Sequence, residues 1–388
     1  MRRLRIVILG MMGRCPYGGQ TWLYLNWILP LHKLGHEVWY VEDDSVWPYD
    51  PVKGTVTDDC SYAVAHVKGA MARIGLPDRW AFRFAGSANA CWGLGPAELD
   101  ELYASCDVLL NIVGATDLRD EHLRAPLRVY VETDPVTAEL RLAAGDEHTR
   151  RAFANHQRIL TYGENYGAPD CGVPLNGIVY GKTRQPVDLE LWPAIYTPDA
   201  PFFTTIGNYR QEGSDVEYQG QVFRWSKHHE WKTFITLPHR TSQPFELALK
   251  VDRAEDKAFL ERHGWCVVPP FEMSLDVFGA YPEYFRRSRA EFTVAKDQNV
   301  RLRSGWFSER DACYLASGKP VVTQDTGFSN SIPTGKGLFG VAAVEEAVAA
   351  IDEINRDYAM HCKAARAIAE EYFDGLNVAS RLVADLGL

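Results

Sequence analysis

Residues 304–328 read SGWFSERDACYLASGKPVVTQDTGF, and this stretch indicates most clearly which fold the chain adopts. Ser308 is a good N-cap because its hydroxyl can accept a hydrogen bond from the first helical turn, and Asp311 supplies the carboxylate version of a capping box. The helix is predicted to end at Ser317, because Gly318 suits a left-handed C-cap and Pro320 cannot continue it. An apolar strand follows at once, so the stretch predicts a helix packed on the sheet of an α/β domain.

Three cations precede this helix along the chain: Lys296, Arg301 and Arg303. The first N–H groups of a helix point out of its amino end, where the helix dipole is positive. Phosphate groups bind readily at such an end. The pattern therefore predicts a diphosphate site at the start of the helix. The alternative is an ordinary capped helix that binds no ligand.

The first half of the chain alternates between short apolar runs and segments with helical periodicity. Continuous apolar runs are typical of parallel strands that are covered on both faces. We expect strands at residues 5–10, 38–41, 80–84, 107–114, 127–132 and 158–161, and helices at residues 17–34 and 96–104.

Residues 163–199 are rich in Gly, Pro and Asn and show no period, which indicates a link between two domains. The alternation then restarts. We expect strands at residues 202–206, 231–236, 246–251, 265–268, 291–295, 320–324 and 337–341. Helices are expected at residues 275–287, 308–317, 344–373 (as two helices that meet near residue 358) and 376–386.

These patterns predict an α/β protein made of two tandem Rossmann-like domains, each a doubly wound parallel sheet, that face each other across a cleft. We expect residues 1–180 to form the N-terminal domain, 181–200 the interdomain linker and 201–388 the C-terminal domain, whose last helix could cross back to the first domain. Ligands of doubly wound sheets bind beyond the carboxyl ends of the strands, so the cleft is the expected active site.

The composition argues against several classes of protein. Lys and Arg number 41 and Asp and Glu 51, and the formal net charge of −10 disfavours a protein that wraps nucleic acid. The eight cysteines lack zinc-knuckle or redox-pair spacing, which predicts reduced thiols in a cytoplasmic protein. The start, MRRLRIVILG, suits a first strand better than a signal peptide, and no run reaches the ~18–20 apolar residues of a membrane span.

Two elements around the opening helix resemble a known family. GWFS at 305–308 resembles the Gly-Trp-Asn-Ser turn, and ASGKPVV at 316–322 the small-Gly-x-Pro-Val-Val element, of GT-B glycosyltransferases. The stretch is similar to a bacterial group of family 1 glycosyltransferases related to spore-maturation glycosyltransferases. GEN at 163–165, TIGN at 205–208 and QDTGF at 324–328 also fit that group, so the likeness covers most of residues 160–375.

The resemblance implies a glycosyltransferase that moves a sugar from a nucleoside diphosphate sugar to a hydroxyl of a small molecule or glycan, such as a natural product or a cell-envelope glycan. The second domain would hold the nucleotide and the first the acceptor. No metal or other cofactor would be required, because cations and the helix end would stabilise the diphosphate. The partners would be these two substrates and no nucleic acid, with peripheral membrane contact at most, in a monomer or homodimer. Two alternatives remain: a GT-B enzyme that epimerises or hydrolyses a nucleotide sugar, and a nucleotide-sugar-binding protein without catalysis.

The resemblance and the positions of the loops together suggest the residues that contact the donor. Between its two signature glycines the chain is two residues longer than the plant-type pattern, so the family's helical acidic residue aligns with Asp311 or Cys313. Glu309 is a further candidate for that role. Lys227 is the expected counterpart of a cation that meets the diphosphate. The remaining candidates follow strands or begin helices: Gly18, Gly19, Gly207, Asn208, Lys296, Arg301, Arg303, Ser308, Asp325, Thr326 and Gly327.

Glu132 and Asp134 follow a predicted strand of the first domain and are the candidates for a base that deprotonates the acceptor hydroxyl. Their acid-x-acid pattern also resembles the metal motif of GT-A glycosyltransferases, whose oxygen ligands suit Mg or Mn. That fold does not need the complete second sheet predicted here. A structural cap before Pro135 is the other alternative, and the acidic run at residues 42–44 is a weaker competitor for the base.

Three further features have simpler interpretations. His228 and His229 are adjacent, a poor spacing for shared metal ligation, so no metal site is predicted. The helix expected at residues 21–34 is dense in aromatic residues and leucine, which favours a buried core helix over a membrane-docking one. Trp47, Tyr49 and Trp92 lie in first-half loops and are candidates for stacking on an acceptor.

Overall fold

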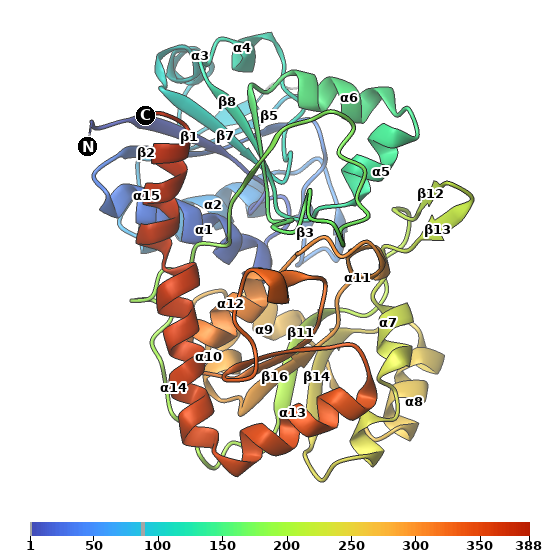
Figure 1. Cartoon of the computed structure of the whole chain (residues 1–388). Coiled ribbons are helices and arrows are strands. Elements are labelled where there is room, and N and C mark those ends of the chain that lie inside the picture. The colour runs from blue at the N-terminus through green and yellow to red at the C-terminus, as the bar shows by residue number, and fades with distance from the viewer. Residues whose placement is uncertain (1, 87–89) are drawn as a thin grey trace.

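The structure is a computed structural model that describes residues 2–86 and 90–388. The first half of these residues forms a sheet with the order β10-β9-β8-β7-β1-β2-β5-β6, in which neighbours are parallel except β5 and β6 (Figure 1). Its strands are β1 (Arg5–Leu9), β2 (Glu37–Asp44), β5 (Trp80–Phe84), β6 (Ala90–Trp92), β7 (Val108–Ile112), β8 (Arg128–Glu132), β9 (Arg158–Thr161) and β10 (Tyr180–Lys182).

The second half forms a parallel sheet with the order β15-β14-β11-β16-β17-β18. Its strands are β11 (Phe203–Asn208), β14 (Phe245–Lys250), β15 (Cys266–Val268), β16 (Ala290–Thr293), β17 (Val321–Gln324) and β18 (Leu338–Val341). The order of strands reverses between β1 and β7 in the first sheet and between β11 and β16 in the second. The predicted pair of doubly wound sheets is therefore confirmed, and each has a crevice at the carboxyl ends of its central strands.

Helices surround both sheets. Those of the first half are α1 (Gly18–Lys33), α2 (Ser61–Arg73), α3 (Pro96–Ser105), α4 (Asp120–Leu123), α5 (Thr137–Ala143) and α6 (Glu147–Ala154). Those of the second half are α7 (His228–Thr233), α8 (Ala254–Arg262), α9 (Phe271–Leu275), α10 (Ala280–Arg286), α11 (Asp297–Arg301), α12 (Glu309–Ala316), α13 (Val344–Arg356) and α14 (Tyr358–Ile368). Trp22, Tyr24 and Trp27 of α1 are buried, so this helix belongs to the core as expected.

The helix predicted at residues 308–317 forms as α12. Ser308 caps α12 and its Oγ accepts from the Arg310 amide at 3.2 Å. Ser317 is the C-cap, and Gly318 follows with φ +71°, a left-handed conformation that glycine adopts without strain. Because both caps lie within the helix's own neighbourhood, local sequence was enough to locate it.

Two predicted elements are wrong. Residues 231–236, expected as a strand, form the end of helix α7 and the turn after it, because Trp231, Phe234 and Leu237 recur every third residue and all three are buried in one core. The helix expected at 275–287 is broken, since the Asp276 carboxylate accepts from the Gly279 and Ala280 amides at 3.1 and 2.8 Å and starts α10 afresh.

The link between the two halves is bound to both of them. Strand β10 extends the first sheet past residue 180, and the segment before it is tied to the second half. The Asn165 amide donates to Ser304 O at 3.1 Å, and the Gly172 amide donates to Leu302 O at 2.9 Å. The loop that precedes α12 therefore rests on the segment between β9 and β10 of the first sheet.

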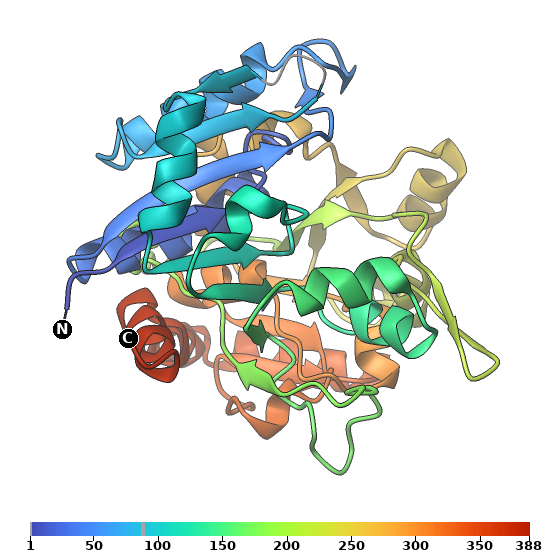
Figure 2. The same ribbon diagram turned by 90° about the horizontal axis from the view of Figure 1, so that it is seen from above.

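Two small hairpins and the C-terminal helices complete the fold. The hairpin β3 (Tyr49–Asp50) and β4 (Thr55–Val56) belongs to the first half, while β12 (Val216–Tyr218) and β13 (Gln221–Phe223) leave the second half and lie beside α5 (Figures 1 and 2). After α14, a π-helical turn at Ala369–Phe373 leads into α15 (Gly375–Asp385), which packs against α1 (Figure 1). Within residues 2–86 and 90–388, no helix has both the length and the apolar character that a membrane span needs.

Gly305→Ala is expected to lower the free energy of unfolding by about 2–4 kcal/mol. Gly305 has φ +82°, and a Cβ there would lie 2.3 Å from the Asn165 backbone nitrogen. Gly54→Ala is the matched control, because Gly54 has φ +68° with nothing within 4 Å of its Cβ position, so about 1 kcal/mol is expected. Urea denaturation measures both. Equal losses would show that the contact with Asn165 is unimportant.

Candidate active site

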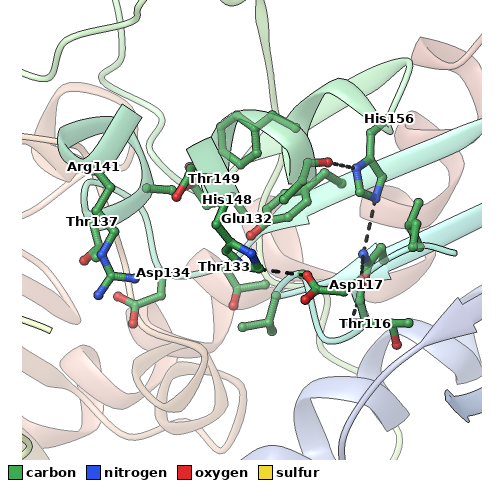
Figure 3. A pocket seen from close by; sticks show the side chains of 18 of the residues that line it. Thr116, Asp117, Glu132, Thr133, Asp134, Thr137, Arg141, His148, Thr149 and His156 are labelled. Carbon is green, nitrogen blue, oxygen red and sulfur yellow. Dashed lines mark hydrogen bonds and ion pairs between the residues drawn. The ribbon is translucent and has the colours of Figure 1, made fainter. Parts of the chain in front are cut away.

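A cavity of about 640 Å³ lies at the carboxyl ends of β1, β7 and β8, where the first sheet reverses its order. Met11 follows β1, Gly114 follows β7, and residues 132–134 follow β8 along its wall. Helices α5 and α6 close one side, as Figure 3 shows. The second half contributes the rest of the wall through Gln211, Ser214, Trp225 and Lys296. The cavity is therefore built mainly on the first domain and completed by the second.

Asp134 stands where this cavity meets the second half. One carboxylate oxygen, Oδ2, accepts from Lys296 Nζ, while the other, Oδ1, is buried and has no hydrogen-bond partner among the described residues. Lys296 is itself buried, with Nζ 2.9 Å from the centroid of the Trp225 ring. Asp134 thus has one oxygen held in place by a cation and one without a hydrogen-bond partner among the described residues.

The β8–α5 loop that bears Asp134 is fixed across the interface. Trp306 Nε1 donates to Thr133 O at 2.9 Å, and Gln298 Nε2 donates to Thr137 Oγ1 at 2.8 Å. Val136 has φ +91°, which is costly for a β-branched residue, and its amide donates to Glu139 Oε2 at 2.8 Å. Strain of this kind persists only where surrounding contacts enforce it, and here those contacts aim Asp134 into the cavity.

Glu132 also lines the cavity, but its environment differs from that of Asp134. It is 3% exposed, and Thr161 Oγ1 donates to its Oε2 at 2.8 Å. Burial raises the pKa of Glu132 well above its usual range, and the neighbouring Glu139 carboxylate raises it further. Glu132 therefore holds its proton more strongly than an exposed glutamate, whereas Asp134 is paired with a cation, which makes Asp134 the better placed base of the two predicted candidates.

Across from this loop, the second sheet reverses its order between β11 and β16. Gly207 and Asn208 end β11, and Lys296 follows β16, so these three predicted residues share the crevice of the second half. A Cβ on Gly207 would lie 3.6 Å from Arg310 Nη1, an ordinary contact distance. Glycine at this position therefore leaves room for a ligand to come close, but the site would also accept a Cβ.

Lys227 stands beside the same crevice, near Asp311 and Glu291 but without a direct ion pair to either. Its Nζ lies 5.3 Å from the centroid of the Trp306 ring and forms no ion pair with any residue in the described part of the chain. Burial and the positive charge of Arg310 lower the pKa of Lys227 to about 7. If an anion bound beside Lys227, the lysine would take up a proton more readily and would form an ion pair with that anion.

The first turn of α12 contains two candidates for the family's helical acidic residue, and their environments differ. Glu309 is half-buried, and burial raises its pKa to about 7, with the Asp134 carboxylate adding to the effect. Asp311 is 1% exposed and accepts from Arg310 Nη2 at 3.2 Å. Arg310 also donates to Glu291 Oε1 at 2.5 Å. Arg310, Asp311 and Glu291 thus form a buried cluster at the base of the crevice. Glu309 is therefore the more accessible of the two acids.

Arg301 and Arg303 have protein partners. Arg301 donates to Val222 O at 2.9 Å and stacks 4.3 Å from the centroid of the Phe223 ring, so it anchors the β12–β13 hairpin. Arg303 donates to Asp170 Oδ2 at 2.8 Å and lies 3.7 Å from Asp325 Oδ2. Arg301 and Arg303 thus have partners within the protein, and their contact with a diphosphate stays a prediction.

The turn after β17 is also occupied by contacts within the protein. Asp325 Oδ1 accepts from the Gly327 amide at 2.9 Å, and Thr326 Oγ1 donates to Trp306 O. Gly327 has φ +93°, and a Cβ there would lie 2.9 Å from Asn165 Nδ2. These three predicted residues shape the loop around Trp306, and their contact with a sugar remains a prediction.

Gly18 and Gly19 begin α1, where they bring the two halves together. The Gly18 amide donates to Ser274 Oγ at 3.3 Å, and a Cβ on Gly18 would lie 2.4 Å from the Tyr281 ring. Gly19 faces the Tyr281 hydroxyl at a longer distance, 3.3 Å from the Cβ position. Close packing of α1 against the second half is therefore one reason for glycine here, and phosphate binding stays a prediction.

The acidic and histidine clusters outside the cavity have internal partners. Asp43, Glu121 and His122 lie close enough together to hold a metal ion. However, the Asp43 carboxylate already accepts from Arg83 Nε at 2.9 Å and from Tyr103 Oη at 2.8 Å, as well as from His122 and Arg119. Its oxygens are saturated by donors, so these residues fit a charged structural network better than a metal site.

Sequence reasoning missed several residues that shape the site. Trp225, Trp306 and Arg310 were not assigned contacts, and Arg141, on the cavity wall, received no role. Trp306 lies within the recognised turn, so the motif contained a usable signal. Trp225 and Arg141 lie in segments without a motif, and only the folded chain brings them to the cavity.

The sequence matches no protein-family model and no curated protein. Its fold is similar to solved glycosyltransferase structures at low identity. AviGT4, a glycosyltransferase involved in avilamycin A biosynthesis, is 13% identical with a TM-score of 0.55, over 98% of this chain and 96% of that chain. Anabaena Alr3699/HepE in complex with UDP and glucose is 12% identical with a TM-score of 0.57, over 99% of this chain and 100% of that chain. An alpha-glucosyltransferase in complex with UDP and a 13-mer DNA containing an HMU base is 12% identical with a TM-score of 0.61, over 100% of both chains. These likenesses show that the chain has the GT-B fold.

Proposed function

We propose that this chain, which has the GT-B fold, is a glycosyltransferase that moves a sugar from a nucleoside diphosphate sugar to an acceptor hydroxyl. The observation that supports this most directly is the free, buried Oδ1 of Asp134 in a cavity formed by both halves. A carboxylate oxygen without a partner, at the carboxyl end of a strand beside a switch point, is placed to act on a bound substrate.

The donor would bind to the second half. Lys227 and the amino end of α12 would meet the diphosphate, and Glu309 would hydrogen-bond a hydroxyl of the ribose or the sugar. Solved structures with this fold include complexes with UDP and UDP-glucose, so UDP-glucose is the first donor to test.

The acceptor would lie in the cavity of the first half. Its hydroxyl oxygen would form a bond to the anomeric carbon while its proton passes to Asp134 Oδ1. The bond from that carbon to the diphosphate would break, and Lys227 would stabilise the negative charge on the departing nucleoside diphosphate. Closure of the two halves, which Trp306 and Lys296 already connect to the β8–α5 loop, would exclude water from the reaction.

We further propose that no metal is required, because Lys227 and the α12 terminus supply positive charge to the diphosphate. All eight cysteines are free thiols, which fits a cytoplasmic protein. A monomer or a homodimer would both be compatible with the assignment.

A thermal-shift series with UDP-, GDP- and dTDP-sugars, with and without EDTA, tests the proposal. A ligand at 100 times its Kd stabilises the folded state by about 2.7 kcal/mol, so we expect one nucleotide class to raise Tm clearly. The shift should persist in EDTA, and loss of the shift there would contradict metal independence. No stabilisation by any nucleotide sugar would argue against the function itself. Turnover of the donor without an acceptor would indicate an epimerase or hydrolase instead.

A further inference from the structure

The cavity has an excess of positive charge in an acidic chain. Its wall includes four cationic and three acidic side chains: Arg119, Arg141, Arg151 and Lys296, with Asp117, Glu132 and Asp134. Burial and the Glu139 carboxylate raise the pKa of Glu132, so this group carries a negative charge less readily than an exposed glutamate. The formal net charge of the whole chain is −10, so the cavity is positive against the general trend. Local charge of this sign favours an anionic ligand.

Only some of these cations are neutralised by the protein. Arg119 pairs with Asp43 and Glu121, and Lys296 pairs with Asp134. Arg141 forms no ion pair or side-chain hydrogen bond with any residue that the structure describes, although it is half-buried. In Figure 3 its guanidinium points into the cavity on the same side as Asp134. A guanidinium with five unused N–H donors is well suited to bind a carboxylate or phosphate through two hydrogen bonds.

Two residues that line the cavity each have a buried oxygen atom without a hydrogen-bond partner in the described part of the chain. Thr116 is 2% exposed and lines the cavity, and its Oγ1 has no hydrogen-bond partner among the described residues. Asp134 Oδ1 is also buried and has no hydrogen-bond partner among the described residues. Buried polar groups are nearly always paired, so unpaired ones in a cavity indicate where a ligand's polar groups belong. Hydroxyl groups would satisfy both atoms.

We infer that the acceptor is a polyhydroxylated molecule bearing a carboxylate or phosphate group, and that Arg141 pairs with this anionic group while Asp134 faces the hydroxyl that receives the sugar. This inference rests on the proposed function, because it specifies the acceptor of that reaction. The donor's own diphosphate is the other source of a suitable anion. Arg141 belongs to α5 of the first half, whereas Lys227 and α12 belong to the second, so we assign Arg141 to the acceptor.

Binding of matched sugars to the full chain tests this assignment. Isothermal titration calorimetry would compare glucuronate and glucose 6-phosphate, which are anionic, with neutral glucose, and would measure UDP separately. We expect both anionic sugars to bind more tightly than glucose. Arg141→Gln should weaken their binding by about tenfold to a hundredfold, with glucose and UDP unaffected. Arg150→Gln is the control, because Arg150 lies outside this cavity and pairs with Glu147, and it should change none of the affinities.

Three results would overturn the inference. The first is equal binding, or absence of binding, for all three sugars. The second is unchanged binding of the anionic sugars in Arg141→Gln. The third is a loss of UDP affinity in that variant as large as the loss for the anionic sugars, which would place Arg141 in the donor site. The UDP arm reports on the proposed function by itself: if the wild-type chain fails to bind UDP but binds the anionic sugars through Arg141, the anion site stands and the transferase assignment falls.

Discussion

Asp134→Asn is expected to lower kcat for sugar transfer by about 10²- to 10⁴-fold, the usual contribution of a general base. The amide keeps the size of the side chain and can still accept a hydrogen bond from Lys296, but it cannot take up the proton of the acceptor hydroxyl. Steady-state kinetics with saturating donor and acceptor would measure the loss. Donor affinity should change little, because Asp134 faces the cavity of the first half.

Glu132→Gln is the matched control for that prediction. Burial raises the pKa of Glu132 and so favours its protonated form, and an amide resembles a protonated carboxyl in shape and in having both a donor and an acceptor. The amide oxygen can accept from Thr161 as Glu132 Oε2 does, so near wild-type kcat is expected. If Glu132→Gln lost as much activity as Asp134→Asn, or if the latter kept more than about a tenth of wild-type kcat, Asp134 would not be the base.

Lys227→Ala is expected to weaken binding of a nucleoside diphosphate sugar by about tenfold to a hundredfold while leaving binding of the bare nucleoside unchanged. The reason is that Lys227 forms no ion pair with the residues described and stands beside the crevice of the second half. Arg303→Gln should have a smaller effect, because Arg303 already pairs with Asp170 and lies near Asp325. Equal losses for nucleoside and nucleotide sugar would refute a role for Lys227 at the diphosphate.

The same site is expected to make donor binding depend on pH. The pKa of Lys227 is lowered to about 7, so above pH 7 the free protein must take up a proton before this lysine can pair with the diphosphate. Glu309, whose pKa burial raises to about 7, loses a proton over the same range and then repels the diphosphate. Both effects have the same sign, and affinity should fall as pH rises from 6 to 9.

Variants can separate these two contributions. Lys227→Arg keeps its charge throughout this pH range and should remove the part of the pH dependence that is due to the lysine. Glu309→Gln cannot ionise and should remove the part due to the acid. Calorimetric titrations of the nucleotide sugar should therefore show a reduced slope in each single variant and almost none in the double variant. A full slope in the double variant would mean that another group is responsible.

Much of the architecture could be predicted because its signals are local. The caps of α12 at Ser308 and Gly318 lie within a few residues of the helix, and the apolar runs of β1, β7 and β8 stand out from their neighbours. Prediction failed where a short apolar run fits two periods. Residues 231–236 could be paired as a strand or placed on one face of a helix, and packing into the second core selected the helix.

The site was less predictable because its polar contacts join residues that are far apart in the sequence. The sequence places Arg301 and Arg303 a few residues before α12, but their partners come from the β12–β13 hairpin and from Asp170 in the link between domains. Asp311 has the spacing of a capping acid, yet Arg310 draws it into a buried cluster. Proximity along the chain does not say where a side chain points or what neutralises it.

The sequence by itself determined that this chain forms two doubly wound sheets with a capped helix at the crevice of the second, since periodicity and capping act over a few residues. Only the tertiary structure decided which acid is paired with a cation and which acid has a raised pKa. Asp134 and Glu132 are two residues apart, but Lys296 from the other half pairs with the first, while burial and Glu139 raise the pKa of the second. Pairing and pKa depend on groups that distant segments bring together, and that information is absent from any local pattern.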